Sequence, residues 1–183
     1  MRAACLRIGG LLNQTELSRD VGIVQPQAHR FLNLMEATFQ AIRLPGFSVN
    51  RTRRLIKAPR LYWSDTALAL FLAGEREPRG AHLENLVLMD LLAWRDVQAR
   101  RPEVLYWRTA TGLEADFVVE TPERLLPIEV RAAARVTRAD ARGLEAFLDE
   151  YPEITDGALL LHGGDEIFPL SRRVLAAPWW RAI

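Results

Sequence analysis

Cysteine and lysine are almost absent from this chain of 183 residues. The single cysteine, Cys5, excludes an internal disulfide and a cysteine-based zinc site. The three histidines, His29, His82 and His162, are too scattered to form a metal-binding motif. Lys57 is the only lysine among 24 basic residues. We attribute this bias toward arginine mainly to genome composition, although arginine can also bind phosphates with its forked head.

Long apolar runs and a strong net charge are missing as well. No apolar run reaches the roughly 20 residues that a membrane helix needs, and Asn13 and Gln14 interrupt the short apolar stretch at the start. A net charge of +1 creates no global field that would select a partner. Because 49% of the residues are hydrophobic, one domain or two small ones can build a core. We therefore expect a cytoplasmic globular protein without a membrane partner.

Residues 1–76 predict a helix-turn-helix. A helix over residues 1–12 ends near two glycines, and a second helix over residues 15–21 ends at Gly22. Pro26 suits the first turn of a third helix, in which apolar residues recur at helical spacing over residues 28–41. A helix, a tight glycine turn and a helix together indicate a recognition helix. Its exposed face presents Gln25, Gln27, His29, Arg30 and Asn33.

Residues 42–63 predict two strands around a basic connection, which is typical of a wing. The stretch over residues 50–60 contains five cations and no acid. Such a wing holds DNA phosphates while the recognition helix enters a groove. The alternative is a winged helix that docks a protein. The predicted nucleic-acid contacts are Gln27, Arg30, Arg51, Arg53, Arg54 and Lys57.

Residues 77–183 predict a mixed α/β domain. The polar segment over residues 74–80, with glycine and proline, marks the domain boundary. An apolar helix over residues 81–94 follows, then strands over 104–108, 115–120 and 125–131, a helix over 140–150 and a buried strand over 158–161. A further strand is expected over 166–170, and residues 174–180 form an apolar tail. Helices packed on a sheet in this order indicate an α/β fold.

Two acidic strands carry the strongest chemical signal. Glu114 and Asp116 lie two residues apart on one strand, as do Glu129 and Arg131 on the next. Side chains at i and i+2 share a face of a strand. If these faces align, Asp116 and Glu129 converge beside a cation, and two close carboxylates are what a Mg²⁺-type metal requires.

Five groups of residues in this order resemble a known family. They are Leu17–Ile23, Phe31–Phe39, Lys57–Thr66, Gly80–Asn85 and the acidic pair of strands over residues 114–117 and 128–131. They resemble the C-terminal region of a large group of prokaryotic AAA-type ATPases, catalogued as a domain of unknown function. The resemblance covers nearly the whole chain. It implies a winged helix over residues 1–76 and a restriction-endonuclease-like domain of the PD-(D/E)XK type over residues 77–183.

The resemblance also implies roles for particular residues. Asp116 and Glu129 match the carboxylates that hold Mg²⁺ or Mn²⁺, and Glu84 matches a helical glutamate that assists through water. Arg131 stands where the family pattern has lysine, and a guanidinium does not act as a general base. The chain has no phosphate-binding G-x-x-x-x-G-K-[ST] motif, so we expect an ATPase only as a separate domain or subunit.

Three functions remain open from the sequence. The first is a DNA-binding or DNA-processing module, with metal-dependent nuclease activity at Asp116, Glu129, Arg131 and Glu84. The second is a non-catalytic protein-interaction module in which these residues form an inherited ion-pair cluster. The third is homo-oligomerisation through apolar surface, which exposed faces in residues 1–12 and 174–180 would favour.

Overall fold

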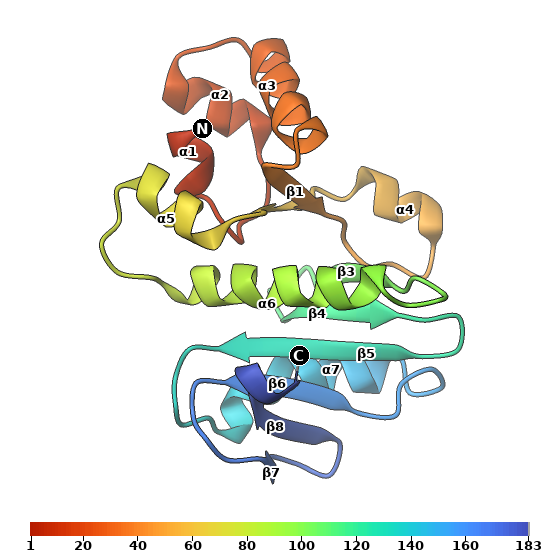
Figure 1. Cartoon of the computed structure of the whole chain (residues 1–183). Helices are drawn as coiled ribbons and strands as arrows, with labels where there is room; N and C mark the ends of the chain where they lie inside the picture. Colours follow the sequence, from red (N-terminus) through yellow and green to blue (C-terminus); the bar gives the residue numbers. More distant parts are fainter. Residues whose placement is uncertain (183) are drawn as a thin grey trace.

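The computed structural model describes residues 1–182 and contains two sheets with helices around them (Figure 1). The mixed α/β class expected from the sequence is confirmed. The helices are α1 (Arg2–Cys5), α2 (Gln14–Val21), α3 (Gln25–Ala37), α4 (Arg51–Ile56), α5 (Thr66–Ala73), α6 (Gly80–Asp96), the 3₁₀ helix η1 (Arg138–Ala141), α7 (Arg142–Glu150) and α8 (Trp179–Ala182). The strands are β1 (Ala41–Leu44), β2 (Arg60–Trp63), β3 (Glu103–Arg108), β4 (Glu114–Glu120), β5 (Leu125–Arg131), β6 (Ala158–His162), β7 (Phe168–Pro169) and β8 (Val174–Pro178).

The expected pair of helices around Gly22 is present as α2 and α3. Asn13 caps α2 by accepting a hydrogen bond from the Glu16 N–H at 3.1 Å. Gly22 ends α2 with φ 71°, a left-handed conformation that favours glycine. Pro26 lies in the first turn of α3. The expected first helix is shorter than residues 1–12, because α1 ends at Cys5 and Gly9 donates to the Leu61 carbonyl beside β2.

The connection between the two small strands differs from the expected wing. Strands β1 and β2 pair antiparallel, with Ala41 opposite Trp63. The basic connection between them contains the helix α4, which Asn50 caps through the Thr52 and Arg53 N–H groups. The structure therefore has a six-residue helix, capped by Asn50, in the place of the predicted wing.

The larger sheet follows the order β3-β4-β5-β6-β8-β7. Strand β4 pairs antiparallel with both β3 and β5, whereas β5, β6 and β8 pair in parallel. The edge strand β7 pairs antiparallel with β8. The expected apolar tail over residues 174–180 is an inner strand, β8, followed by α8. Four of its five residues are buried and Leu175 is 42% exposed, so this apolar strand belongs largely to the core.

Each face of the larger sheet is covered by a helix. Helix α6 lies between the N-terminal helices and the sheet (Figure 1), and its Val87, Leu88 and Leu91 are buried against this sheet face. Helix α7 covers the opposite face. A Cβ atom at Gly143 would lie 1.8 Å from the Glu114 carbonyl oxygen, so only glycine allows α7 to approach β4 this closely.

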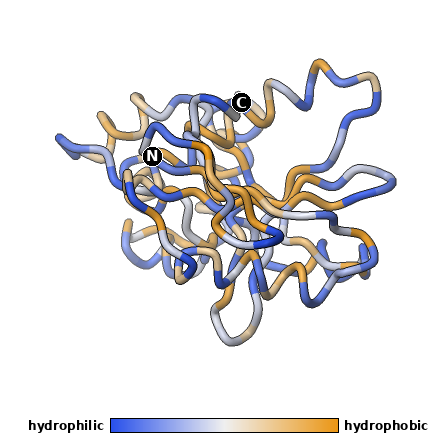
Figure 2. Tube along the Cα trace, turned by 90° about the horizontal axis from the view of Figure 1, so that it is seen from below, coloured by the Kyte–Doolittle hydropathy of each residue, from blue (hydrophilic) through white to orange (hydrophobic). Residues whose placement is uncertain are grey.

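The core on the α6 face is continuous with residues on both sides of the predicted boundary at residue 76. It includes Leu12, Tyr62 and Trp63 as well as Phe117 and Val130. Most hydrophilic segments lie in peripheral loops of the trace (Figure 2). No helix in residues 1–182 is long and apolar enough to cross a membrane.

Candidate functional site

An extra residue in β4 positions Asp116. Between the paired positions Leu105–Val118 and Trp107–Ala115, β4 advances three residues while β3 advances two. This is the pattern of a β-bulge, in which two residues oppose one. Its effect appears in the packing, because Ala115 lies in the core under α7 whereas Phe117 lies in the core under α6. A regular strand would place both on one face.

The bulge interrupts the ladder between β4 and β5, and the Asp116 side chain takes over one hydrogen bond. The last paired residues here are Phe117 and Ile128. Two residues further along β5, the Val130 N–H donates to Asp116 Oδ2 at 3.0 Å. The carboxylate is therefore fixed in the sheet, and only 3% of the residue is exposed.

Arg60 of β2 occupies the other side of this carboxylate. Its Nη1 donates to Asp116 Oδ1 at 3.1 Å and its Nη2 to Glu114 Oε2 at 2.6 Å. The guanidinium also lies 5.2 Å from the centre of the Tyr106 ring. Arg60 is 4% exposed, so this is a buried link between the N-terminal part of the chain and the larger sheet. Both oxygens of Asp116 consequently have partners within the protein.

Arg131 covers the second acidic strand. Its Nη2 forms a close ion pair with Glu129 Oε1, and its Nη1 lies 3.9 Å from Asp116 Oδ2. The Arg131 side chain is 38% exposed, whereas Glu129 is 1% exposed. The second oxygen of Glu129, Oε2, is buried and has no hydrogen-bond partner among the described residues.

Burial raises the pKa of three of these carboxyl groups, Glu84, Asp116 and Glu129, and so disfavours their ionisation. Burial first, and then the charge of Asp116, raise the pKa of Glu129 to about 9. The ion pair with Arg131 acts in the opposite direction. Because that arginine is partly solvated while Glu129 is buried, we take the raised pKa as the net effect. The same two causes raise the pKa of Glu84, on α6, to about 7.

The acidic cluster, defined as Glu84, Glu114, Asp116 and Glu129, is therefore close to electrically balanced. The raised pKa values of Glu84, Asp116 and Glu129 reduce the negative charge that faces the guanidinium groups of Arg60 and Arg131. Balanced charge is the general condition for burying ionisable groups at low cost.

A divalent metal at this cluster would compete with partners that already bind three of the four oxygens of Asp116 and Glu129. A hard cation needs carboxylate oxygens that are free to coordinate it. Arg60 and the Val130 N–H already bind both oxygens of Asp116, and Arg131 binds one oxygen of Glu129. Within residues 1–182, no group of three or more His, Cys, Asp or Glu residues is placed to hold a metal ion. The structure thus brings the predicted residues Glu84, Asp116, Glu129 and Arg131 together, with arginine at the centre.

The basic connection does not present its five cations on one surface. Arg54 is 8% exposed, and its two terminal nitrogens bind the two carboxylate oxygens of Glu120. It forms a further ion pair with Glu103 at 3.1 Å. Arg60 points into the acidic cluster, and Lys57 donates to the Phe47 carbonyl at 2.8 Å. Arg51 and Arg53 remain exposed. Two of the five charges therefore hold the N-terminal part to the larger sheet.

The polar face of α3 is tied into hydrogen bonds within the protein. His29 contacts Gln14 and Asn33, each at 3.1 Å, and Arg43 donates to Asn33 Oδ1 at 2.6 Å. Gln27 and Arg30 are exposed. Contact of these two residues with DNA remains a prediction.

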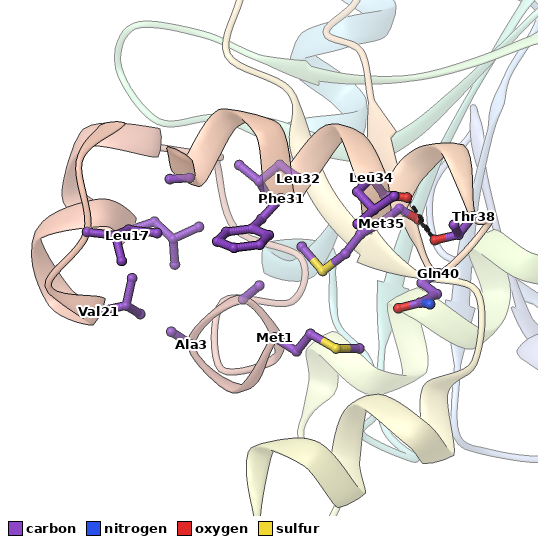
Figure 3. A pocket seen from close by; sticks show the side chains of 13 residues that line it. Met1, Ala3, Leu17, Val21, Phe31, Leu32, Leu34, Met35, Thr38 and Gln40 are labelled. Atoms are coloured by element: carbon purple, nitrogen blue, oxygen red, sulfur yellow. Dashed lines mark hydrogen bonds between the residues drawn. The ribbon is translucent and has the colours of Figure 1, made fainter. Parts of the chain in front are cut away.

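An apolar groove opens between α1, α2 and α3. It has a volume of about 450 Å³. Figure 3 shows Val21, Phe31 and Met35 around it, with Met1 at its rim. Phe31 and Leu34 both line the groove and are 52% and 58% exposed. The α3 surface that faces this space is therefore apolar.

Sequence reasoning missed Arg60 as a site residue and missed the groove. Arg60 was assigned to the basic connection, and its contact with Asp116 spans 56 residues of sequence. The only local signal was its place at the start of an apolar strand, Arg60–Trp63, whose residues are all buried. The groove had a clearer signal, because Phe31 and Leu34 add a second apolar stripe beside Ala28, Leu32 and Met35.

Two family models match the chain, and both describe domains of unknown function. The model for DUF4143 matches residues 79–181, and the model for DUF8612 matches residues 1–79. The two ranges meet in the polar segment between α5 and α6.

Two mycobacterial proteins are similar to nearly the whole chain. They are "Uncharacterized protein Rv2008c" of Mycobacterium tuberculosis and "Uncharacterized protein Mb2031c" of Mycobacterium bovis. Each is 29% identical over 178 residues, which cover 93% of this chain and 38% of the relative. The chain thus spans well under half the length of these relatives. No solved structure matches it.

Proposed function

The chain belongs to the DUF4143 family, and from this premise we propose that it is a non-catalytic protein-interaction module of an AAA-type ATPase. The ordered groups of residues that resemble the C-terminal region of these ATPases support the ATPase context. The greater length of the mycobacterial relatives agrees with it, because they have room for further domains.

One observation carries the non-catalytic part of the proposal. Arg60 lies buried in the acidic cluster and binds Asp116 and Glu114. A phosphodiester that approached Asp116 would have to displace this arginine and the strand that carries it. We therefore propose that the cluster joins the two parts of the chain and has no turnover.

The proposed scaffold is a winged helix followed by a nuclease-like domain. Helices α2 and α3 around Gly22, with the antiparallel pair β1 and β2, support the first assignment. The mixed sheet with a bulge at its aspartate strand supports the second. In this proposal the nuclease-like sheet is a frame that holds the N-terminal helices.

The apolar groove is the proposed interaction surface, and its proposed occupant is a second copy of the chain. Helix α3 lines the groove, and its Phe31 and Leu34 remain more than half exposed. Across a two-fold axis, the same helix can insert these side chains into the partner's groove while receiving the partner's in its own. Met1 and Met35, which also line the groove, can adapt their shape to such an insertion.

Sedimentation equilibrium of the chain tests this surface. The wild-type protein is expected to be a dimer, and Leu34→Glu is expected to be a monomer because it places a charge in the apolar contact. Val97→Glu is the matched control, since Val97 is 80% exposed and lies at the end of α6, away from the groove. A wild-type monomer, or a Leu34→Glu dimer of unchanged strength, would contradict the proposed surface.

A further inference from the structure

A second concave surface lies beside α4, apart from the apolar groove on α3. It is a cleft of about 710 Å³ between the segment over residues 47–57 and the ends of β3 and α7. Its lining combines polar and apolar groups, unlike the groove on α3. A volume of this size is in the range of small-ligand sites. Neither the acidic cluster nor the α3 groove contributes residues to it.

Three cations line this cleft. Arg53 and Lys57 come from α4 and its C-terminal end, and Arg108 comes from the end of β3. Lys57 follows the last residue of α4, and its Nζ donates to the Phe47 carbonyl at 2.8 Å. No carboxylate in residues 1–182 forms an ion pair with Arg53 or Lys57. Arg108 has one distant ion pair, 3.9 Å from Glu114, whose carboxylate is already bound at 2.6 Å by Arg60.

This arrangement contrasts with the other cations of the same connection. Arg54 and Arg60 are neutralised by acids of the larger sheet. The positive charge on the cleft side is not neutralised in this way. An anion that bridges Arg53, Lys57 and Arg108 would relieve their repulsion and would accept hydrogen bonds from two guanidinium groups.

The other residues that line the cleft can contact the ring system and the sugar of a phosphate ester. Tyr151, at the C-terminal end of α7, and Trp107 of β3 line the cleft together with Val49, which is 66% exposed. Glu150 is the one acid among the lining residues, and its Oε1 accepts a hydrogen bond from the Tyr151 hydroxyl. An exposed carboxylate beside an apolar wall can accept hydrogen bonds from sugar hydroxyl groups.

We propose that this cleft binds a phosphate ester the size of a mononucleotide. Arg53, Lys57 and Arg108 hold the phosphate, the ring system lies against Tyr151 and Val49, and Glu150 accepts the hydroxyl groups. This site goes beyond the proposed interaction function and does not depend on it, because the two surfaces share no residue.

Isothermal titration calorimetry of the full chain tests the proposal with four probes: AMP, ADP, inorganic phosphate and a single-stranded oligonucleotide. AMP or ADP is expected to bind at one site. Arg53→Gln and Arg108→Gln are each expected to weaken this binding by roughly tenfold, because each removes a charge-assisted contact. Arg51→Gln is the matched control on the same helix, since Arg51 lines a different hollow with Arg54 and Leu55.

Each other outcome would overturn the assignment. Absence of saturable binding, or equal losses in Arg51→Gln and Arg53→Gln, would show only diffuse attraction of anions. Equal affinity for inorganic phosphate and AMP would show that Tyr151 and Val49 do not bind the ring system of the ligand. Tighter binding of the oligonucleotide, reduced by Arg53→Gln, would assign the cleft to nucleic acid instead.

Discussion

Replacement of Arg60 by alanine is expected to lower the free energy of unfolding by about 3–5 kcal/mol, the usual loss when one partner of a buried ion pair is removed. Arg60 is 4% exposed and is bound to Asp116 and Glu114. Without it, Asp116 keeps only the Val130 N–H and the distant Arg131 as partners. Urea denaturation followed by circular dichroism measures the change.

A surface ion pair provides the comparison for Arg60. Arg124 pairs with Asp156 at 3.1 Å, and both side chains are more than half exposed. Arg124→Ala is therefore expected to change the free energy of unfolding by less than about 1 kcal/mol. An equally small change for Arg60→Ala would show that the acidic cluster does not hold the two parts of the chain together.

Replacement of Glu129 by glutamine is expected to stabilise the protein in alkaline solution and to have little effect in acid. The pKa of Glu129 is raised to about 9 by burial and by the nearby charge of Asp116. In the unfolded chain this group has its ordinary pKa of 4.5. Above that value the unfolded state ionises freely while the folded state retains the proton, so stability falls as the pH rises. The loss is complete above the folded pKa, near pH 9.

Glutamine removes this loss because it never ionises. The gain in the free energy of unfolding for Glu129→Gln at pH 9 relative to pH 4 is expected to be on the order of 2 kcal/mol. This figure is well below the full linkage value, because the substitution also removes the ion pair with Arg131. Urea denaturation across this pH range measures it. Glu123→Gln is the control, since Glu123 is 68% exposed. A Glu129→Gln protein that loses stability at pH 9 would show that the carboxylate is ionised and needed.

Much of the scaffold is predictable because its signals are local. Gly22, Pro26 and the helical spacing of Leu32 and Met35 fix the bounds of α2 and α3 to within a few residues. The two acidic strands were also correctly placed as β4 and β5. Residues 50–57 differ from the predicted wing, because the Asn50 side chain caps the helix α4 within the run of arginines.

The arrangement of the acidic cluster is not predictable in the same way. Alternation along a strand assumes a regular ladder, and the bulge in β4 breaks that assumption between Ala115 and Phe117. The partner of Asp116 is decided by how β2 packs over the larger sheet, which is a long-range contact. Arg60 and Arg53 fall in the same basic stretch over residues 50–60, although one is buried and the other is exposed.

The most direct test of the closed acidic cluster is calorimetric titration of the wild-type chain with Mn²⁺ at pH 8, where Glu84 is ionised. Mn²⁺ reports on oxygen-ligand sites that also take Mg²⁺. If Arg60 and Arg131 close the cluster, no saturable binding of Mn²⁺ will be seen. One-site binding that is lost in Glu129→Gln would contradict this account and return Asp116 and Glu129 to the role of metal ligands.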